Sequence, residues 1–284
     1  MNVYYVTYPS VKPWCSDFTA INLAKYSENI VTPTHPDNLN QIKNAIIHIH
    51  NVQILGKWLR PIKFIEKLQE KGNKVILGLR GFNGLRRYDE LFLACDAIAV
   101  GVDPDLKRYA ENLNKHVHIL PPGENPQLFK PSENEKTSDV CWTGRDHKGF
   151  KNAELIKQLG FTYQTATYNN YVPHDELPMF YNQSKVLVGF SDYEGFWRPC
   201  IEAAMCGLPI VSTPVGVVPE IIDPEFIIPH KARNHLGDYR NKLKQLLDNL
   251  EYARNVGESN RLRALKYSWK NVAPLYDKAW CDLD

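Results

Sequence analysis

The sequence predicts an α/β protein that contains two doubly wound parallel sheets. Short apolar runs alternate with helical patterns along most of the chain, and this alternation is typical of parallel sheets with helices on both faces. The apolar runs form two series, and the proline-rich stretch Pro121–Pro131 and the polar stretch Ser132–Ser138 lie between them. A break of this composition is typical of a connection between domains.

The first series predicts strands from short runs of mainly apolar residues. These runs are Val3–Val6, Ala45–His48, Lys74–Leu77, Ala97–Val100 and Val117–Leu120. Helical spacing of apolar residues predicts helices at Pro61–Gln69 and Pro104–Asn112.

The second series has the same character. Its predicted strands are Asp139–Thr143, Thr162–Thr165, Lys185–Phe190, Ile210–Ser212 and Phe226–Ile228. Its predicted helices are Asn152–Leu159, Glu176–Gln183 and Arg198–Met205. From Leu236 to Trp280 the pattern is helical and predicts no strand.

Composition excludes several classes of protein. The chain has 284 residues, of which 43% are hydrophobic and 23% charged, with a net charge of +2. That charge is too small to indicate nucleic-acid binding, and no apolar run approaches the roughly 20 residues of a membrane span. The N-terminus lacks the pattern of a signal peptide, and the six cysteines show no paired spacing. We therefore expect reduced thiols and a cytoplasmic protein.

Two glutamates mark the predicted binding site. Glu194 and Glu202 are separated by seven residues. Glu194 follows a predicted strand, and Glu202 lies in the helix that comes next, so both are expected at the ligand-binding edge of the sheet. The start of a helix favours an anion, whereas carboxylates suit hydroxyl groups. The combination predicts a ligand that is part phosphate and part sugar.

Charged and polar residues follow other predicted strands. Arg145, Lys148 and Lys151 come after one strand and suit a diphosphate, although a solvated basic loop is an alternative. His50 ends another strand and could donate to a sugar hydroxyl or a departing phosphate; a histidine satisfied within a polar loop is the alternative. Gly216 could let the backbone approach a ligand, and a tight turn explains it equally well.

The segment Lys57–Lys67 is basic and contains aromatic residues. Peripheral contact with an anionic membrane surface is one interpretation. A solvated helix face is the more usual explanation of such a pattern.

Taken together, these residues resemble retaining GT-B glycosyltransferases of the glycosyltransferase family 4 type. Glu194 and Glu202 match the family's pair of glutamates, and the run from Glu202 through Gly216 to Ile222 resembles the usual continuation. Pro121–Pro131 resembles the family's interdomain segment. The resemblance covers most of the chain and is strongest from about Pro121 to Ile222.

The resemblance implies two Rossmann-like domains that face a central cleft, with a shortened N-terminal domain. We expect an acceptor-side domain at residues 1–122 and a nucleotide-sugar-binding domain at residues 123–269. A last helix at about residues 270–284 is expected to pack back on the first domain.

The resemblance also implies roles for the matched residues. Glu194 would bind the donor sugar and Glu202 the ribose of the nucleotide. Arg145, with Lys151 or Lys148, would neutralise the leaving diphosphate in place of a metal ion, so neither metal nor cofactor is expected. The predicted catalytic residues are Glu194, His50, Arg145 and Lys151, and the predicted donor-binding residues are Glu202, Gly195, Phe196, Trp197, Lys148 and Gly216.

Trp197 stands where family members often have a second glycine, so a narrowed sugar pocket is expected. The implied reaction moves a sugar from a UDP-, GDP- or ADP-linked donor to a glycan, lipid-linked or small-molecule acceptor, with retention of configuration. One alternative is a catalytically silent relative that binds nucleotide sugar or a protein partner. Another is a nucleotide-sugar epimerase or a DNA-modifying glucosyltransferase, and the small net charge argues against the DNA version.

Overall fold

The chain forms two compact units. The computed structural model describes residues 1–7, 15–57, 60–82, 85–113, 115–133, 135–147 and 149–283. The first unit comprises Met1–Gly123 together with Trp269–Asp284, and the second comprises Glu124–Ser268. The chain therefore leaves the first unit once and returns to it through its last helix.

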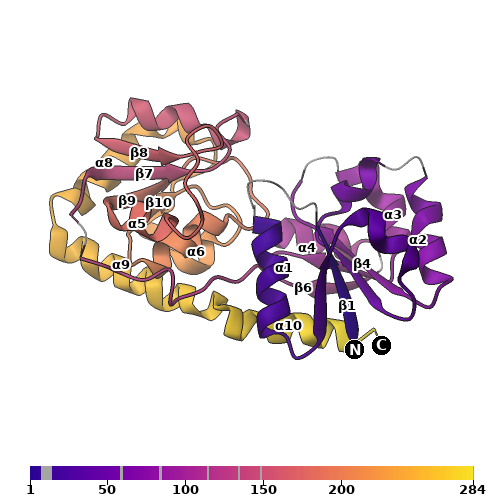
Figure 1. The fold of residues 1–284 in the computed structure, drawn as a ribbon. Coiled ribbons are helices and arrows are strands. Elements are labelled where there is room, and N and C mark those ends of the chain that lie inside the picture. Colours follow the sequence, from indigo (N-terminus) through magenta and orange to yellow (C-terminus); the bar gives the residue numbers. More distant parts are fainter. Residues whose placement is uncertain are drawn as a thin grey trace. The chain divides into compact units, whose positions relative to one another are not determined.

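A parallel sheet forms the centre of the first unit (Figure 1). Its strand order is β2-β1-β3-β4-β5-β6. The strands are β1 (Asn2–Val6), β2 (Ile30–Thr34), β3 (Ile46–Ile49), β4 (Lys74–Leu79), β5 (Ala97–Val100) and β6 (His116–Ile119). All described pairs in it are parallel.

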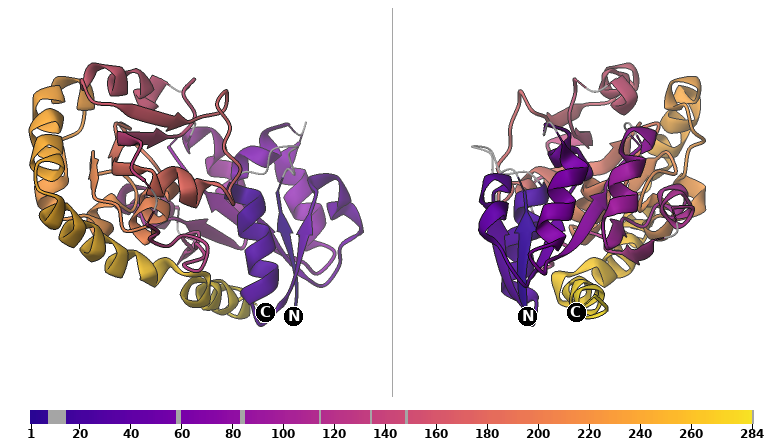
Figure 2. Two further views of the ribbon diagram at one scale, coloured as in Figure 1. Left: turned by 60° about the vertical axis from the view of Figure 1, so that its left-hand side comes forward. Right: turned by 90° about the vertical axis from the view of Figure 1, so that its right-hand side faces the viewer.

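Helices cover both faces of this sheet (Figures 1 and 2). They are α1 (Cys15–Tyr26), α2 (Pro61–Gln69), α3 (Asp89–Ala94), α4 (Pro104–Glu111) and α10 (Trp269–Cys281), with 3₁₀ turns at Pro36–Gln41, Val52–Lys57 and Leu85–Tyr88. The first core packs side chains of α2, α3 and α4 against alternate residues of β3 and β4. The helix pair α1 and α10 packs together on the opposite face.

Local sequence explains why these elements form. All residues of β3 and β5 are buried, which is typical of parallel strands covered on both faces. Helix α4 begins with Pro104 after Asp103, whose side chain accepts hydrogen bonds from the amides of Asp105 and Leu106. A carboxylate at that position satisfies amides that the first turn of a helix leaves unpaired.

The second unit contains a smaller parallel sheet with the order β10-β9-β7-β8. Its strands are β7 (Ser138–Thr143), β8 (Tyr163–Ala166), β9 (Ser184–Gly189) and β10 (Ile210–Ser212). Its helices are α5 (Leu177–Asn182), α6 (Arg198–Met205), α7 (Val218–Ile221), α8 (Leu236–Leu247) and α9 (Leu250–Ala264). Shorter 3₁₀ turns cover Gly149–Lys151, Ala153–Gln158, Pro224–Phe226, Ala232–Asn234 and Leu265–Tyr267.

The helices of the second unit also lie on two faces. A hydrophobic core joins α8 and the turn Ala153–Gln158 to one face of β7, β9 and β10. On the other side, α5 contacts β9, α6 contacts β10, and α9 packs along α6. Helix α6 ends at Gly207, whose φ of 76° allows the left-handed turn that stops a helix.

The predicted fold class of two parallel α/β sheets is confirmed, while several elements differ. Strand β2 was missed because Pro33 interrupts its apolar pattern, and a proline is tolerated there because β2 is an edge strand. The strand predicted at Phe226–Ile228 is wrong: Pro224 starts a 3₁₀ turn, and only an isolated bridge joins Ile227 to Ser212. The helix predicted at Asn152–Leu159 is a 3₁₀ turn.

The basic segment Lys57–Lys67 does not present Phe64 to a membrane. Phe64 lies on α2 and packs into the first core with 7% of its surface exposed. Trp58 lies outside the described residues. Within the described parts of the chain, we find no helix with the length and apolar character that crossing a membrane requires.

Close packing between α9 and α6 yields a test of the second unit. A Cβ atom on Gly257 would lie 2.0 Å from the carbonyl oxygen of Gly207, whereas one on Gly237 in α8 would meet no atom within 4 Å. We predict that Gly257→Ala lowers the free energy of unfolding by about 1–3 kcal/mol, because the helices must move apart.

The matched variant Gly237→Ala should leave that free energy unchanged or raise it by up to about 1 kcal/mol, because alanine is the better helix former. Urea unfolding of both variants measures the difference. Equal stability of the two variants would show that α6 and α9 do not pack as closely as the structure has them.

Candidate functional site

A loop at the carboxyl end of β9 carries the first predicted glutamate. Ser191 Oγ donates to Glu194 Oε1 at 2.9 Å, and Lys151 Nζ forms an ion pair with the same oxygen. The side chains of Glu194 and Lys151 are each only 14% exposed. Two predicted catalytic residues, one acidic and one basic, are therefore in direct contact and neutralise each other.

The loop after β7 joins the loop after β9. The ring of Phe150 stacks on Tyr193 with 4.3 Å between centroids, and the amide of Asp192 donates to the carbonyl of Phe150 at 2.9 Å. These contacts bring the turn Gly149–Lys151 beside Glu194. Both loops leave the carboxyl ends of neighbouring strands, the edge at which open α/β sheets bind ligands.

The other predicted cations have different positions. Arg145 is exposed and follows β7 directly, in the same loop as Lys151. Lys148 lies outside the described residues, so the choice between Lys148 and Lys151 as the phosphate lysine stays a prediction. Within the described part of this loop, Arg145 is exposed, and Lys151 is largely buried against Glu194.

A third loop, after β10, contacts the glutamate loop through glycine. Gly216 has φ of 54°, and a Cβ atom there would lie 2.5 Å from the backbone carbonyl of Phe196. The amide of Val217 donates to the Phe196 oxygen at 2.9 Å. Gly216 is therefore required for contact between the two loops. Gly195, which comes directly before Phe196, is also buried.

Trp197 points into the protein. The residue has φ of 59°, and its side chain is 4% exposed. Its ring lies over Gly189 of β9, where a Cβ atom would be 2.5 Å from Cη2. A left-handed conformation costs about 1–2 kcal/mol, while burying an indole contributes roughly 4 kcal/mol. The ring lies against the sheet, so it stabilises the turn before α6.

The second predicted glutamate belongs to a buried polar cluster. Glu202 Oε2 accepts a 2.7 Å hydrogen bond from the Tyr181 hydroxyl, and Oε1 lies 3.2 Å from Arg198 Nε. Arg198 also donates to Glu124 Oε2, through Nε at 3.0 Å and Nη2 at 2.7 Å. His174 Nε2 lies 3.3 Å from that same oxygen.

The two carboxyl groups of this cluster differ in acidity. Burial alone would raise the pKa of Glu124, but Arg198 and His174 outweigh it and hold the pKa at about 2. Burial and the nearby Glu124 raise the pKa of Glu202, against the opposing charge of Arg198. Glu124 is thus a fixed anion, and Glu202 is the member of the pair that can take up a proton.

This cluster already contains a positive charge, the guanidinium of Arg198. Oxygen or nitrogen atoms of Glu124, His174 and Glu202 lie within 4.8 Å of one another, a spacing that a metal ion could bridge. The guanidinium of Arg198 donates to one carboxylate and contacts the other. The guanidinium therefore supplies the positive charge that a metal ion would bring to these carboxylates.

Sequence patterns did not indicate Glu124 or Arg198 as site residues. Arg198 and Glu202 are four residues apart on α6, and this spacing places both side chains on one helix face. That spacing was a usable signal. The partner Glu124 is far away in the sequence, so no local pattern could reveal it.

His50 belongs to the first unit, at the carboxyl end of β3. Its ring Nδ1 lies 2.8 Å from the Tyr5 hydroxyl, and its carbonyl accepts from Arg80 Nε at 3.1 Å. Arg80 also donates to the carbonyl of Leu120 at 2.7 Å. Burial raises the pKa of Tyr5, so the phenol stays neutral. Both the ring and the backbone of His50 are held by neighbouring elements.

His48 is a core residue. It is fully buried, and its Nδ1 accepts a hydrogen bond from Trp280 Nε1 at 3.1 Å. Burial lowers the pKa of His48 well below its usual value, with further lowering by Arg80 and His50. His48 is therefore neutral in the folded protein and joins β3 to α10.

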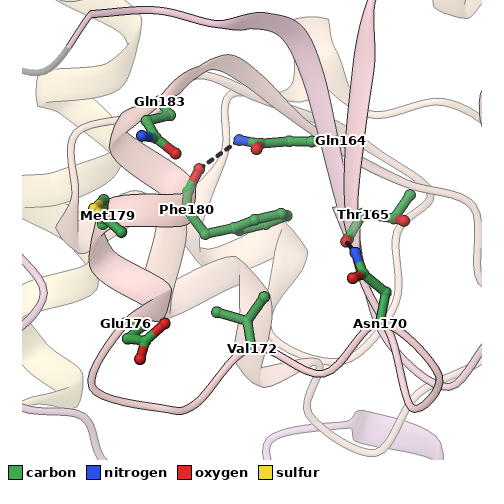
Figure 3. A pocket seen from close by; sticks show the side chains of 8 residues that line it. All are labelled: Gln164, Thr165, Asn170, Val172, Glu176, Met179, Phe180 and Gln183. Carbon is green, nitrogen blue, oxygen red and sulfur yellow. Dashed lines mark hydrogen bonds between the residues drawn. The ribbon is translucent and has the colours of Figure 1, made fainter.

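A separate pocket of about 240 Å³ lies between β8 and α5 (Figure 3). Gln164 and Phe180 line it, and the Gln164 amide donates to the Phe180 carbonyl at 2.7 Å. Asn170 closes one side by donating to Thr165. None of the predicted site residues lines this pocket.

The comparisons with known proteins agree with this architecture. Over nearly the full length of both chains, the structure is similar to HepE from Anabaena in complex with UDP and glucose, with a TM-score of 0.76 and 10% identity over 100% of each. Sucrose-phosphate synthase from Thermosynechococcus elongatus gives a TM-score of 0.73 at 14% identity, covering 99% of this chain and 98% of that one. The fold is GT-B.

Sequence comparison finds relatives that match part of the chain. Residues 144–263 match the family described as "Glycosyl transferases group 1". The chain is 26% identical to an MMP alpha-(1->4)-mannosyltransferase of Mycolicibacterium hassiacum, over 68% of this chain and 55% of the relative. It is 29% identical to O-antigen chain mannosyltransferase B of Escherichia coli, over 37% of this chain and 27% of the relative.

The chain thus matches the group 1 glycosyltransferase family over residues 144–263 and has the GT-B fold. It spans about half the length of the first of these curated relatives and about a quarter of the second.

Neutral His48 predicts a pH dependence of stability. A histidine whose pKa is depressed on folding takes up its proton only in the unfolded chain, so stability is lost as pH falls below about 6.5. We predict that between about pH 7 and 5.5 the parent loses about 1 kcal/mol more unfolding free energy than His48→Gln.

The glutamine keeps an acceptor for Trp280 and removes the titration. Urea unfolding of both proteins at the two pH values measures the difference, since the other titrating groups cancel. Parallel loss of stability in the two proteins would mean that His48 is not held neutral.

Proposed function

We propose that this protein is a retaining glycosyltransferase that uses a nucleoside-diphosphate sugar. The observation that supports it most directly is the contact between Glu194 and Lys151 at the carboxyl edge of the second sheet. Each of these groups suits one part of such a donor: the carboxylate suits sugar hydroxyls, and the ammonium suits the diphosphate. The domain spanning residues 123–269 is the proposed donor-binding domain, and residues 1–122 with the last helix form the proposed acceptor-side domain.

Donor binding would exchange the internal ion pair for contacts with ligand. Lys151 would turn to the diphosphate, together with Arg145, while Glu194 would accept hydrogen bonds from the sugar. Buried amides at Gly195 and Trp197 precede α6, and the start of a helix favours a phosphate. No charge would then be left uncompensated in a site where Glu194 is largely shielded from water.

The proposed reaction breaks the bond between the anomeric carbon and the β-phosphate oxygen. The acceptor hydroxyl oxygen forms the new bond on the same face, and its proton passes to the departing phosphate. Arg145 and Lys151 would stabilise the negative charge that develops there. His50 would donate a hydrogen bond to a hydroxyl of the transferred sugar, and Tyr5 would orient its ring.

Mannose is the sugar that the relatives favour. Two curated relatives are described as mannosyltransferases, and we propose a hexose, with mannose first, as the transferred sugar. A catalytically silent protein that binds nucleotide sugar remains the second candidate, favoured by the ion pair that blocks both Glu194 and Lys151 in this structure.

The proposed donor site can be tested by ligand stabilisation. Thermal unfolding of the protein is measured with GDP-mannose, UDP-glucose, UDP-N-acetylglucosamine and ADP-glucose. A bound donor at about 100 times its dissociation constant should add about 2.7 kcal/mol to the unfolding free energy. If none of the donors stabilises the protein, the proposed function is wrong.

Catalysis is tested by hydrolysis of the donor that binds. We predict that Glu194→Gln and Lys151→Met each lower the rate by about a hundredfold, because each removes a group that stabilises the transition state. The control Glu251→Gln changes an exposed glutamate of α9 and should keep the parent rate. A donor that binds but is hydrolysed at equal rates by parent and Glu194→Gln would favour the silent relative.

A further inference from the structure

One guanidinium contacts two buried carboxylates in the second unit. Arg198 lies 2.7 Å from Glu124 Oε2 through Nη2 and 3.2 Å from Glu202 Oε1 through Nε. The exposed fractions of the Arg198, Glu124 and Glu202 side chains are 8%, 1% and 6%. Charges this deeply buried are held only with partners that compensate them, so the three groups act as a unit.

Glu124 holds the guanidinium from outside helix α6. Its second carboxylate oxygen accepts from the amide of Asn125 at 2.9 Å. Its backbone amide donates to the carbonyl of Tyr267 at 2.8 Å, and a bridge to Ser268 lies beside it. The carboxylate that anchors Arg198 is therefore fixed through both its side chain and its backbone.

We propose that Arg198 and Glu124 are positioning residues that fix the carboxylate of Glu202 for the two vicinal hydroxyls of a nucleotide's ribose. This inference rests on the proposed function, in which the donor carries a nucleotide, and it places the ribose of that nucleotide at Glu202. Arg198 contacts one oxygen of Glu202 and Tyr181 contacts the other. A carboxylate offers about four acceptor positions, so two remain for hydroxyl groups, and their directions are set by the two protein contacts.

The same arrangement controls the charge of Glu202. The groups that face it are Glu124, Arg198, His174 and Tyr181, and it in turn faces Cys206 at the end of α6. Glu124 favours the protonated form of Glu202, and Arg198 favours the carboxylate. Only the carboxylate accepts hydrogen bonds from both hydroxyls of a ribose. Removal of Glu124's charge should extend ribose binding to lower pH, and removal of Arg198 should restrict it to higher pH.

Nucleotides with and without ribose hydroxyls test this directly. UDP, GDP and their 2′,3′-dideoxy forms are titrated calorimetrically into the full chain. At about pH 8 the parent should bind the ribonucleotide about tenfold or more tightly than the dideoxy form, since bonds to a charged acceptor are strong. In Arg198→Met this preference should fall below about threefold, with little change in affinity for the dideoxy form.

Glu124→Gln should shift the pH dependence of ribose binding in the direction opposite to Arg198→Met. It should keep the ribose preference of the parent at about pH 8, and the pH at which that preference is half lost should move down. Since Arg198→Met leaves the buried Glu124 without its guanidinium partner and can fail to fold, the double variant Glu124→Gln/Arg198→Met removes both charges together. It should lose the ribose preference as Arg198→Met does.

Arg254→Met, which changes an exposed residue of α9, is the control and should bind both ligands as the parent does. Variants that keep the full ribose preference, or that lose affinity for both forms by one factor, overturn the inference. If the parent binds the ribonucleotide and the dideoxy form equally, the inference about Arg198 and Glu124 is wrong, while the proposed function is unaffected. A parent that binds neither nucleotide overturns it together with the proposed function.

Discussion

The second unit depends on one buried guanidinium, that of Arg198. It connects the residue at which the chain enters the unit, Glu124, with the middle of helix α6 at Glu202. Without it, two carboxylates would be buried close together with no cation between them, a state that proteins avoid by protonation or unfolding. The start of α6, and with it the turn that carries Gly195 to Trp197, is therefore fixed by an interaction between distant parts of the sequence.

Sequence alone predicted the architecture well because parallel sheets leave a strong pattern. Buried strands such as β9 are nearly continuous apolar runs. The ends of α6 are also marked by local residues, because a proline lies in its first turn and Gly207 follows its last turn. Elements without such patterns were missed or misassigned. Strand β2 contains Pro33. The run at Phe226–Ile228 is apolar because it packs in the core with α8, and only an isolated bridge pairs it with β10.

The site was predicted as a set of residues, and its internal contacts were not predicted. His50 was predicted at the end of a strand, and its ring, like that of His48 two residues earlier, contacts Tyr5. The contact of Lys151 with Glu194 joins two loops that are 43 residues apart in the sequence. The hydrogen bonds between Arg198 and Glu124 join residues that are 74 positions apart. Such contacts depend on how strand ends meet in space, which periodicity does not encode. The roles assigned to these residues remain proposals.

The ion pair of Lys151 and Glu194 has a consequence for product release. On the proposed function, a complete donor compensates both groups at once: its diphosphate pairs with the lysine, and its sugar bonds to the glutamate. A nucleoside diphosphate left after transfer pairs only with Lys151. The shielded carboxylate of Glu194 would then keep Ser191 as its partner and lack a compensating charge. Re-formation of the internal pair would then compete with the product for Lys151, so the protein carries its own displacing counter-ion.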